Sequence, residues 1–92
     1  MTYFVYILTS LKDSKRYIGM TSDLSRRLNE HNSGKVKSTK NRRPLELIYT
    51  EEFTSKQDAL NRETFFKSGI GREFLKSIGC SILTIVDFYY HF

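Results

Sequence analysis

Two tyrosines in apolar surroundings, Tyr6 and Tyr17, could act together on a phosphate group. Ten residues separate them, and two strands joined by a short turn would place their phenols side by side. A phenol could deprotonate a water that attacks phosphorus. Its pKa is ordinarily ~10, so it needs a nearby cation to favour the phenolate. Taken singly, a tyrosine in a strand is more often a core residue whose hydroxyl meets a polar partner.

Three further residues suit phosphate chemistry: Arg27, His31 and Glu63. Arg27 could bind a scissile phosphate through two donors and stabilise charge in the transition state. His31 is either a satisfied core histidine or a general acid or base. Glu63 falls within an apolar stripe, where a carboxylate is costly unless it is paired or binds a metal. It could pair with Arg27 or another cation, or it could be a ligand of Mg²⁺, which keeps several waters.

The apolar pattern predicts three strands and three helices that would position these side chains. We expect strands over residues 3–10, 16–20 and 45–53. The first helix should run from Ser22 or Asp23 to Gly34, with Leu24, Leu28 and His31 on one face and Arg27 at its edge. In the third strand, Leu45, Leu47 and Tyr49 alternate with the residues between them.

A capping box over residues 54–57 predicts the start of the second helix. Near one face of it lie Ala59, Glu63, Phe66 and Ile70. Gly69 and Gly71 are expected to interrupt it, and a short third helix is expected over residues 72–78. Residues 81–92 are apolar and aromatic, and their pattern fits a strand, a helix or an adhesive tail equally well.

The formal charge of +5 is concentrated in the first half of the chain. Residues 1–45 carry ten Lys/Arg and three Asp/Glu, whereas residues 46–92 carry five and seven. The basic block over residues 35–43 is either a phosphate-binding patch or a solvated loop. The predicted nucleic-acid-binding residues are Arg26, Lys35, Lys37, Lys40, Arg42 and Arg43.

The length and the cysteine content bound the class of protein. A chain of 92 residues is expected to form one domain. The single Cys80 cannot form an internal disulfide, which favours a reducing compartment. Neither a signal peptide nor a membrane span is expected, so the prediction is a cytoplasmic protein, monomeric or weakly dimeric.

These residues, taken in order, resemble the motifs of the GIY-YIG nuclease superfamily, and in particular its small stand-alone bacterial members. The first motif corresponds to Phe4-Val5-Tyr6, and the second, unaltered, is Tyr17-Ile18-Gly19. Arg27 stands at the family's arginine position, and His31 lies in the Glu-His-Asn context of the small members. Glu63 is at the centre of a segment similar to the metal-binding helix. The resemblance covers about residues 3–78, although Phe4 replaces the first glycine, and no separate DNA-binding domain is expected.

The resemblance implies an α+β fold, a three-stranded antiparallel β-sheet flanked by helices in the order β-β-α-β-α-α. It implies a nuclease-like domain over residues 1–80, followed by the tail over 81–92. It also implies a metal-dependent endonuclease that hydrolyses DNA phosphodiester bonds, on branched, damaged or single-stranded DNA, with RNA as an alternative partner.

In the implied mechanism, Glu63 holds Mg²⁺ or Mn²⁺, Tyr17 activates water with Tyr6 in support, and Arg27 neutralises developing charge. His31 completes the implied catalytic set. Two other hypotheses remain open from the sequence. One is a nucleic-acid-binding module with weak or no catalytic activity, and the other is a protein-interaction domain that uses its aromatic tail.

Overall fold

An antiparallel hairpin begins the fold, and a third strand joins the first strand on its other side. The computed structural model describes residues 1–77. Its strands β1 (Tyr3–Ser10), β2 (Arg16–Thr21) and β3 (Leu45–Phe53) lie in the order β2-β1-β3. Helix α1 (Leu24–Asn32) and the 3₁₀-helix η1 (Lys40–Arg42) connect β2 to β3, and α2 (Lys56–Phe66) and α3 (Gly69–Ser77) follow. The predicted α+β fold and element order are therefore confirmed.

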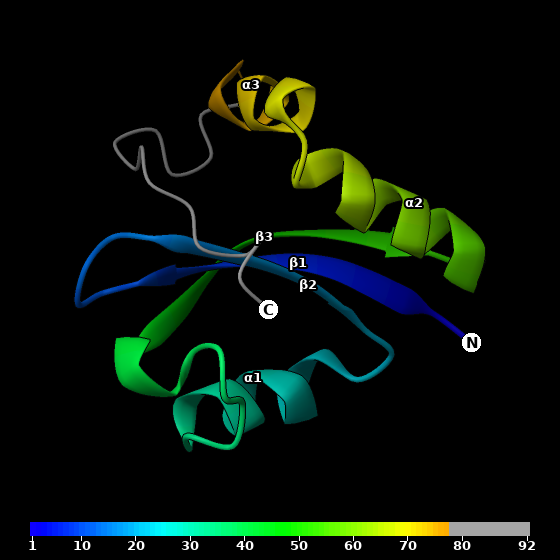
Figure 1. Ribbon diagram of the computed structural model, residues 1–92. Coiled ribbons are helices and arrows are strands. Elements are labelled where there is room, and N and C mark those ends of the chain that lie inside the picture. The colour runs from blue at the N-terminus through cyan, green and yellow to red at the C-terminus, as the bar shows by residue number, and fades with distance from the viewer. Residues whose placement is uncertain (78–92) are drawn as a thin grey trace.

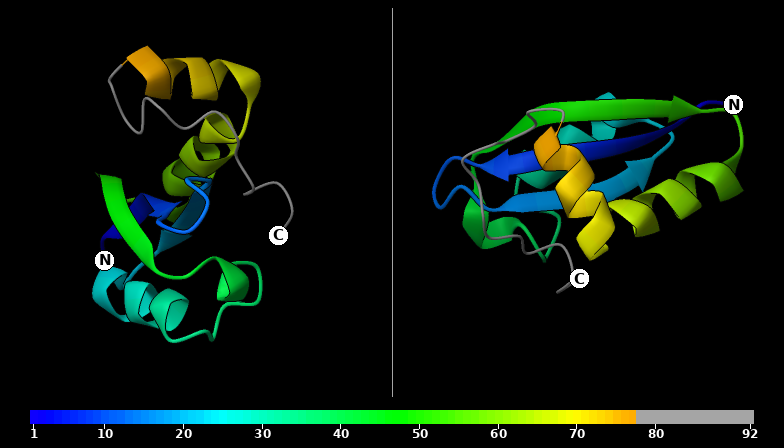
Figure 2. Two further views of the ribbon diagram at one scale, coloured as in Figure 1. Left: turned by 90° about the vertical axis from the view of Figure 1, so that its left-hand side faces the viewer. Right: turned by 90° about the horizontal axis from the view of Figure 1, so that it is seen from above.

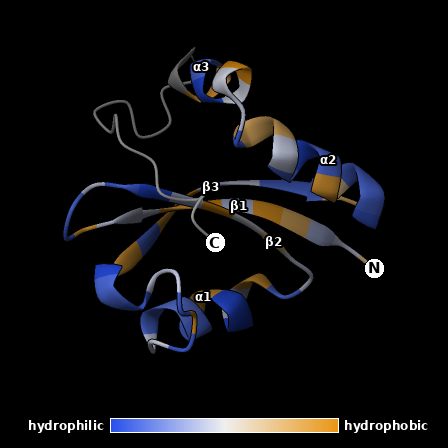
Figure 3. Ribbon diagram, in the orientation of Figure 1, coloured by the Kyte–Doolittle hydropathy of each residue, from blue (hydrophilic) through white to orange (hydrophobic). Residues whose placement is uncertain are grey.

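Helices cover both faces of the sheet. Helix α1 lies on one side, whereas α2 and α3 lie on the other (Figure 1), and α3 crosses over the strands when seen from above (Figure 2). The central strand β1 is consequently buried on both faces. Val5 and Ile7 pack in the cluster that includes Ala59 of α2, and Tyr6 and Leu8 belong to the cluster on the α1 side. Hydrophobic residues lie along β1 itself, whereas α1 is largely hydrophilic (Figure 3).

Strand β3 contains a bulge that interrupts the predicted alternation. The register against β1 shifts between the pairs Ile7–Tyr49 and Leu8–Leu47. An extra residue in one strand moves every following side chain to the opposite face. Leu45 and Leu47 thus pack on the α1 side, but Tyr49 packs on the α2 side, contrary to the prediction of one shared face.

The boundary between α2 and α3 also differs from the prediction. The α2 cap is Ser55, whose side chain accepts a hydrogen bond from the backbone N–H of Asp58. Helix α3 begins at Gly69 rather than at residue 72, because the Ser68 hydroxyl accepts a hydrogen bond from the Gly71 N–H. The chain therefore bends before the glycines, and Ile70 is 75% exposed instead of continuing the apolar stripe of α2.

Glycine is required where α3 turns back onto α2. A Cβ built at Gly71 would lie 1.8 Å from the backbone carbonyl oxygen of Phe65, a contact that a fixed backbone cannot relieve. This close approach lets Phe66 and Leu75 join one core cluster above the sheet. The tight turn between α2 and α3 thereby helps to fix the position of α2, the helix that carries Glu63.

The α1 helix has the boundaries that its sequence predicts to within two residues. Asp23 caps it by accepting a hydrogen bond from the Arg26 N–H, and Gly34 beyond its end has a φ of +85°. The basic loop that follows is not irregular throughout, since η1 occupies residues 40–42. Residues 81–92 lie outside the described part of the chain. Within residues 1–77, no helix combines the length and hydropathy that a membrane span needs.

Candidate active site

Tyr6, Tyr17 and His31 form a triangle of rings between the sheet and α1. Ring centroids are 6.2 Å apart for the two tyrosines, 5.7 Å for Tyr6 and His31, and 4.8 Å for Tyr17 and His31. Only 1% of Tyr6, 4% of Tyr17 and none of His31 is exposed. The Tyr6 hydroxyl lies 2.9 Å from Nε2 of His31. The hairpin thus brings together the two phenols, and α1 adds an imidazole in direct contact.

Gly19 makes room for the Tyr6 hydroxyl. It pairs with Tyr6 across the hairpin, and a Cβ at this position would lie 2.5 Å from the Tyr6 oxygen. The same Cβ would lie 3.1 Å from the Tyr17 ring. The glycine of the Tyr17-Ile18-Gly19 motif therefore has a steric role, because no side chain fits beneath the phenol.

Arg27 contacts both phenols from α1. Its Nη1 donates a hydrogen bond to Oε1 of Glu30 at 3.0 Å, and against the larger effect of burial it lowers the pKa of both phenols. Partial burial disfavours the guanidinium, but its interactions with Tyr6 and Glu30 outweigh this effect and raise the Arg27 pKa. Arg27 therefore keeps its charge beside the phenols, with a third of its side chain exposed to an incoming anion.

Burial, rather than the adjacent cation, decides the protonation of the phenols. Burial raises the pKa of Tyr6 well above its usual value, and the nearby Tyr17 adds to the effect, while Arg27 lowers it only in part. Burial likewise raises the pKa of Tyr17 against the charge of Arg27 and a hydrogen bond to Ser38. Burial and then the Arg27 charge lower the pKa of His31 to about 4. At neutral pH the site therefore holds two neutral phenols and a neutral imidazole.

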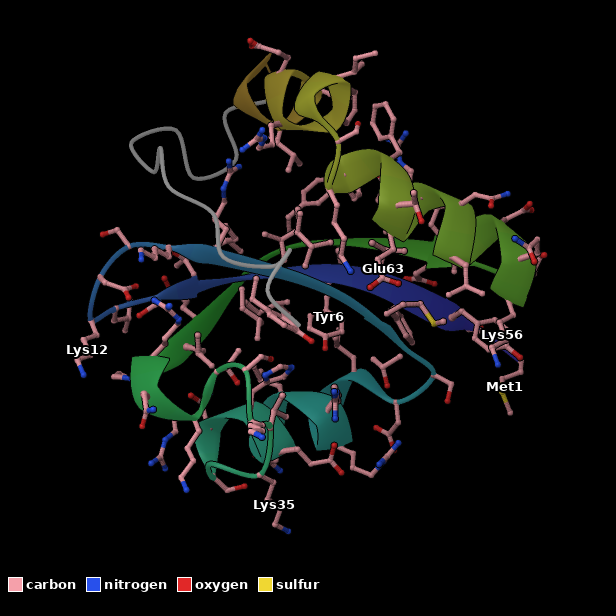
Figure 4. The ribbon with its side chains drawn as sticks, in the orientation of Figure 1. Met1, Tyr6, Lys12, Lys35, Lys56 and Glu63 are labelled. Atoms are coloured by element: carbon pink, nitrogen blue, oxygen red, sulfur yellow. The ribbon has the colours of Figure 1, made fainter. Side chains whose placement is uncertain are left out.

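Glu63 approaches this group from the opposite side of the sheet. Figure 4 shows Glu63 on α2 above the strands and Tyr6 beneath them. The Glu63 carboxylate pairs with Lys67 at 2.9 Å, and 16% of its side chain is exposed. Burial is the main cause that raises the pKa of Tyr6 and Tyr17, and the negative charge of Glu63 adds a smaller contribution in the same direction.

The donor chemistry around Glu63 fits only a metal ion that needs few protein ligands. Within residues 1–77, no group of three or more His, Cys, Asp or Glu side chains could hold an ion. A structural zinc site needs such a set. A single carboxylate is sufficient for Mg²⁺, which takes its remaining ligands from water and substrate phosphate.

The six basic residues predicted to bind nucleic acid separate into two groups. Each arginine has a partner in the fold: Arg26 pairs with Glu30 at 3.0 Å, Arg42 pairs with Asp13 at 2.5 Å, and Arg43 donates to the Lys40 carbonyl at 2.9 Å. The side chains of the other three, Lys35, Lys37 and Lys40, are exposed and belong to none of the described ion pairs. The lysines are thus the group available to phosphates.

Sequence reasoning missed three residues that contact the candidate site. Glu30 holds Arg26 and Arg27, and its spacing of four and three residues from them on a helix could have revealed it. Ser38 is hydrogen-bonded to Tyr17, and Thr39 lies 2.8 Å from Nδ1 of His31. The last two lie in a loop without periodicity, where no sequence signal points to a contact with α1.

The sequence and the fold match a known class of catalytic domain. The GIY-YIG catalytic domain family matches residues 2–73, which include every residue of the candidate site. The chain belongs to this family, a class of nuclease-type domains whose substrates are nucleic acids.

Similar proteins include bacterial UPF0213 proteins. The chain is 46% identical to YazA of Bacillus subtilis over 66 residues, which are 71% of this chain and 66% of that relative. It is 43% identical to a UPF0213 protein of Staphylococcus epidermidis over 77 residues, or 83% of this chain and 93% of the relative. The solution structure of UPF0213 protein BH0048 from Bacillus halodurans is 41% identical, covers 85% of each chain and has a TM-score of 0.53.

Proposed function

We propose that this chain is a metal-dependent endonuclease that hydrolyses DNA phosphodiester bonds. The observation that carries the proposal is the gathering of Tyr6, Tyr17, Arg27 and His31 at one site to which the Glu63 charge is coupled. These groups supply a proton path, a cation for phosphate and a carboxylate for a hard metal ion. Branched, damaged or single-stranded DNA is the proposed substrate, with RNA as the alternative.

We assign proton transfer to Tyr6 and His31, because the proton of Tyr6 has an acceptor within reach. As water attacks phosphorus and the bond from phosphorus to the leaving sugar oxygen breaks, the proton of the water passes to the Tyr6 oxygen while the Tyr6 proton passes to Nε2 of the neutral His31. The leaving oxygen takes a proton from solvent. Tyr17, beside the same imidazole, positions the phosphate. This assignment exchanges the roles that the sequence-based hypothesis gave to the two tyrosines.

Arg27 and Glu63 supply the charges of the proposed mechanism. The exposed part of Arg27 binds the scissile phosphate and stabilises the negative charge that develops on it. Glu63 would hold Mg²⁺ or Mn²⁺ once Lys67 releases its carboxylate. Such an ion, when bound, polarises a phosphoryl oxygen as a Lewis acid.

The test is cleavage of a panel of branched, nicked, single-stranded and duplex DNA with Mg²⁺ or Mn²⁺. We expect metal-dependent cleavage that Glu63→Gln reduces by at least ~10³-fold, because the carboxylate ligand is lost. Glu52→Gln, at an exposed position of β3, is the matched control and should cleave like the unaltered chain. Full metal-dependent cleavage by the Glu63→Gln variant would remove Glu63 from the proposed metal site.

The second candidate function is nucleic-acid binding without turnover. It is favoured by the raised pKa of both buried phenols and by the three exposed lysines. It predicts no cleavage with any metal, together with binding that weakens as salt rises. Replacing Lys35, Lys37 and Lys40 by alanine should then reduce the slope of log K against log salt by up to ~0.9 per lost phosphate contact.

The exposed Lys56 of α2, in the acidic half of the chain, is the control for this measurement. Its replacement by alanine should leave the salt slope unchanged. An unchanged slope in the triple lysine variant would show that the basic loop is not the binding surface.

A further inference from the structure

The loop between α1 and β3 has a buried end that reaches the candidate active site. Thr39 is fully buried, and its hydroxyl lies 2.8 Å from Nδ1 of His31. Thr39 stands at the N-cap position of η1, yet its side chain makes no capping hydrogen bond. A threonine at this position would ordinarily use its hydroxyl as the cap. Here the hydroxyl is directed to the imidazole instead.

The hydrogen bonds at the two nitrogens of the imidazole are all satisfied in only one tautomer. At one end, the Thr39 hydroxyl has the Val36 carbonyl oxygen at 3.5 Å as the acceptor for its own proton, so its lone pairs are free to accept from Nδ1–H. At the other end, Nε2 of His31 lies 2.9 Å from the Tyr6 hydroxyl and is the only acceptor that the described residues offer to its proton. Both ends are satisfied together only when the proton of His31 is on Nδ1.

The opposite tautomer leaves a buried group without a partner. If Nε2 carried the proton, it would donate to the Tyr6 oxygen, and the Tyr6 proton would lose its acceptor at 2.9 Å. An unsatisfied buried hydroxyl is costly, which disfavours this arrangement. It would also remove the acceptor that the proposed proton transfer needs.

We propose that Thr39 is a positioning residue that holds His31 in the Nδ1–H tautomer and so keeps Nε2 as the acceptor for the Tyr6 proton. The catalytic consequence rests on the nuclease proposed above, but the tautomer does not. Thr39 acts through His31 and touches neither the phosphate nor the metal. The loop that carries Lys35 and Lys37 on the protein surface therefore also determines which nitrogen of the buried His31 accepts the proton.

The experiment combines ring-nitrogen NMR with kinetics in a chain whose other histidine is replaced, His91→Gln. In this background the ¹⁵N shifts of His31 at pH 7 should show a protonated Nδ1 and an unprotonated Nε2. Thr39→Ser keeps the hydroxyl and should keep this pattern. Thr39→Val replaces the hydroxyl by a methyl group of similar shape and should shift the pattern toward protonated Nε2.

The kinetic arm separates this proposal from the nuclease itself. On the DNA substrate with Mg²⁺, Thr39→Val should lower kcat at least ~10-fold with KM unchanged, within the ~10²–10⁴-fold that general acid–base catalysis supplies. Thr39→Ser, which keeps the hydroxyl, should have a kcat close to that of the unaltered chain. If no variant cleaves DNA, the proposed nuclease activity is refuted, but the ¹⁵N shifts still test the tautomer.

Two results would overturn the proposal. A protonated Nε2 in the otherwise unaltered chain would do so even if Thr39→Val does not fold. An unchanged Nδ1–H pattern in folded Thr39→Val would show that another group holds the imidazole.

Discussion

Replacing Gly19 by alanine should destabilise the fold and separate Tyr6 from His31. The new Cβ would lie 2.5 Å from the Tyr6 oxygen, and ordinary contact begins at 3.4 Å, so the phenol must withdraw by about 0.9 Å. The hydroxyl is held 2.9 Å from Nε2 of His31, and a shift of that size is enough to break this hydrogen bond.

Two energetic terms set the expected size of the effect. Overpacking a filled core costs about 1–3 kcal/mol, and losing a buried hydrogen bond costs about 1 kcal/mol. Each kcal/mol corresponds to roughly 4–8 °C in Tm for a domain of this size. If the proposed nuclease is correct, misplacing the phenol by this distance should also slow cleavage about 10²-fold.

The assay is urea unfolding followed by circular dichroism, with cleavage measured on the same samples. Gly69→Ala is the matched control, because a Cβ there has no atom within 4 Å, and its stability should not fall. In a Tyr6→Phe background the penalty of Gly19→Ala should shrink without vanishing, since the ring carbon Cζ would still lie 2.7 Å from the new Cβ. If Gly19→Ala and Gly69→Ala are equally stable, the steric account of the motif glycine is refuted.

Two further predictions concern protonation. Because the folded pKa of His31 is about 4 and the unfolded value is 6.5, the unfolded chain binds an extra proton between these values. Stability should therefore fall by roughly 3 kcal/mol as the pH drops from 6.5 to 4, as measured by urea unfolding across that range. His31→Gln should lack this contribution, and equal pH slopes in the two proteins would contradict it. Tyr6→Phe should lower kcat at least ~10-fold more than Tyr17→Phe, and the reverse order would return the proton transfer to Tyr17.

The strands and α1 could be predicted because their signals are local. Alternating and continuous apolar residues located Tyr6 and Tyr17 on adjacent strands, and the i, i+4, i+7 spacing placed His31 on the inner face of α1 with Leu24 and Leu28. The observed elements agree, and the ring triangle lies where those two periodicities meet.

The misassigned positions share a dependence on contacts beyond the local pattern. The bulge that turns Tyr49 to the α2 side follows from pairing with β1, and the start of α3 depends on the Ser68 cap ahead of the two glycines. A period of two or of 3.6 contains neither piece of information. The ion-pair partner of Glu63 is a different case, because Lys67 follows it by four residues and this helical spacing could have revealed the pair.

The residue types and their spacing thus determined which groups are present: two phenols, an arginine, a histidine and a carboxylate. The tertiary structure decided how those groups behave. Sequence reasoning expected a cation to favour a phenolate, but burial outweighs Arg27 and leaves both phenols protonated, with a neutral His31 at hydrogen-bond distance from Tyr6. Thr39, eight residues along the chain from His31 in a loop without periodicity, has its role only because the loop folds back on α1. Desolvation and long-range hydrogen bonds depend on the whole packed chain, and no local pattern encodes them.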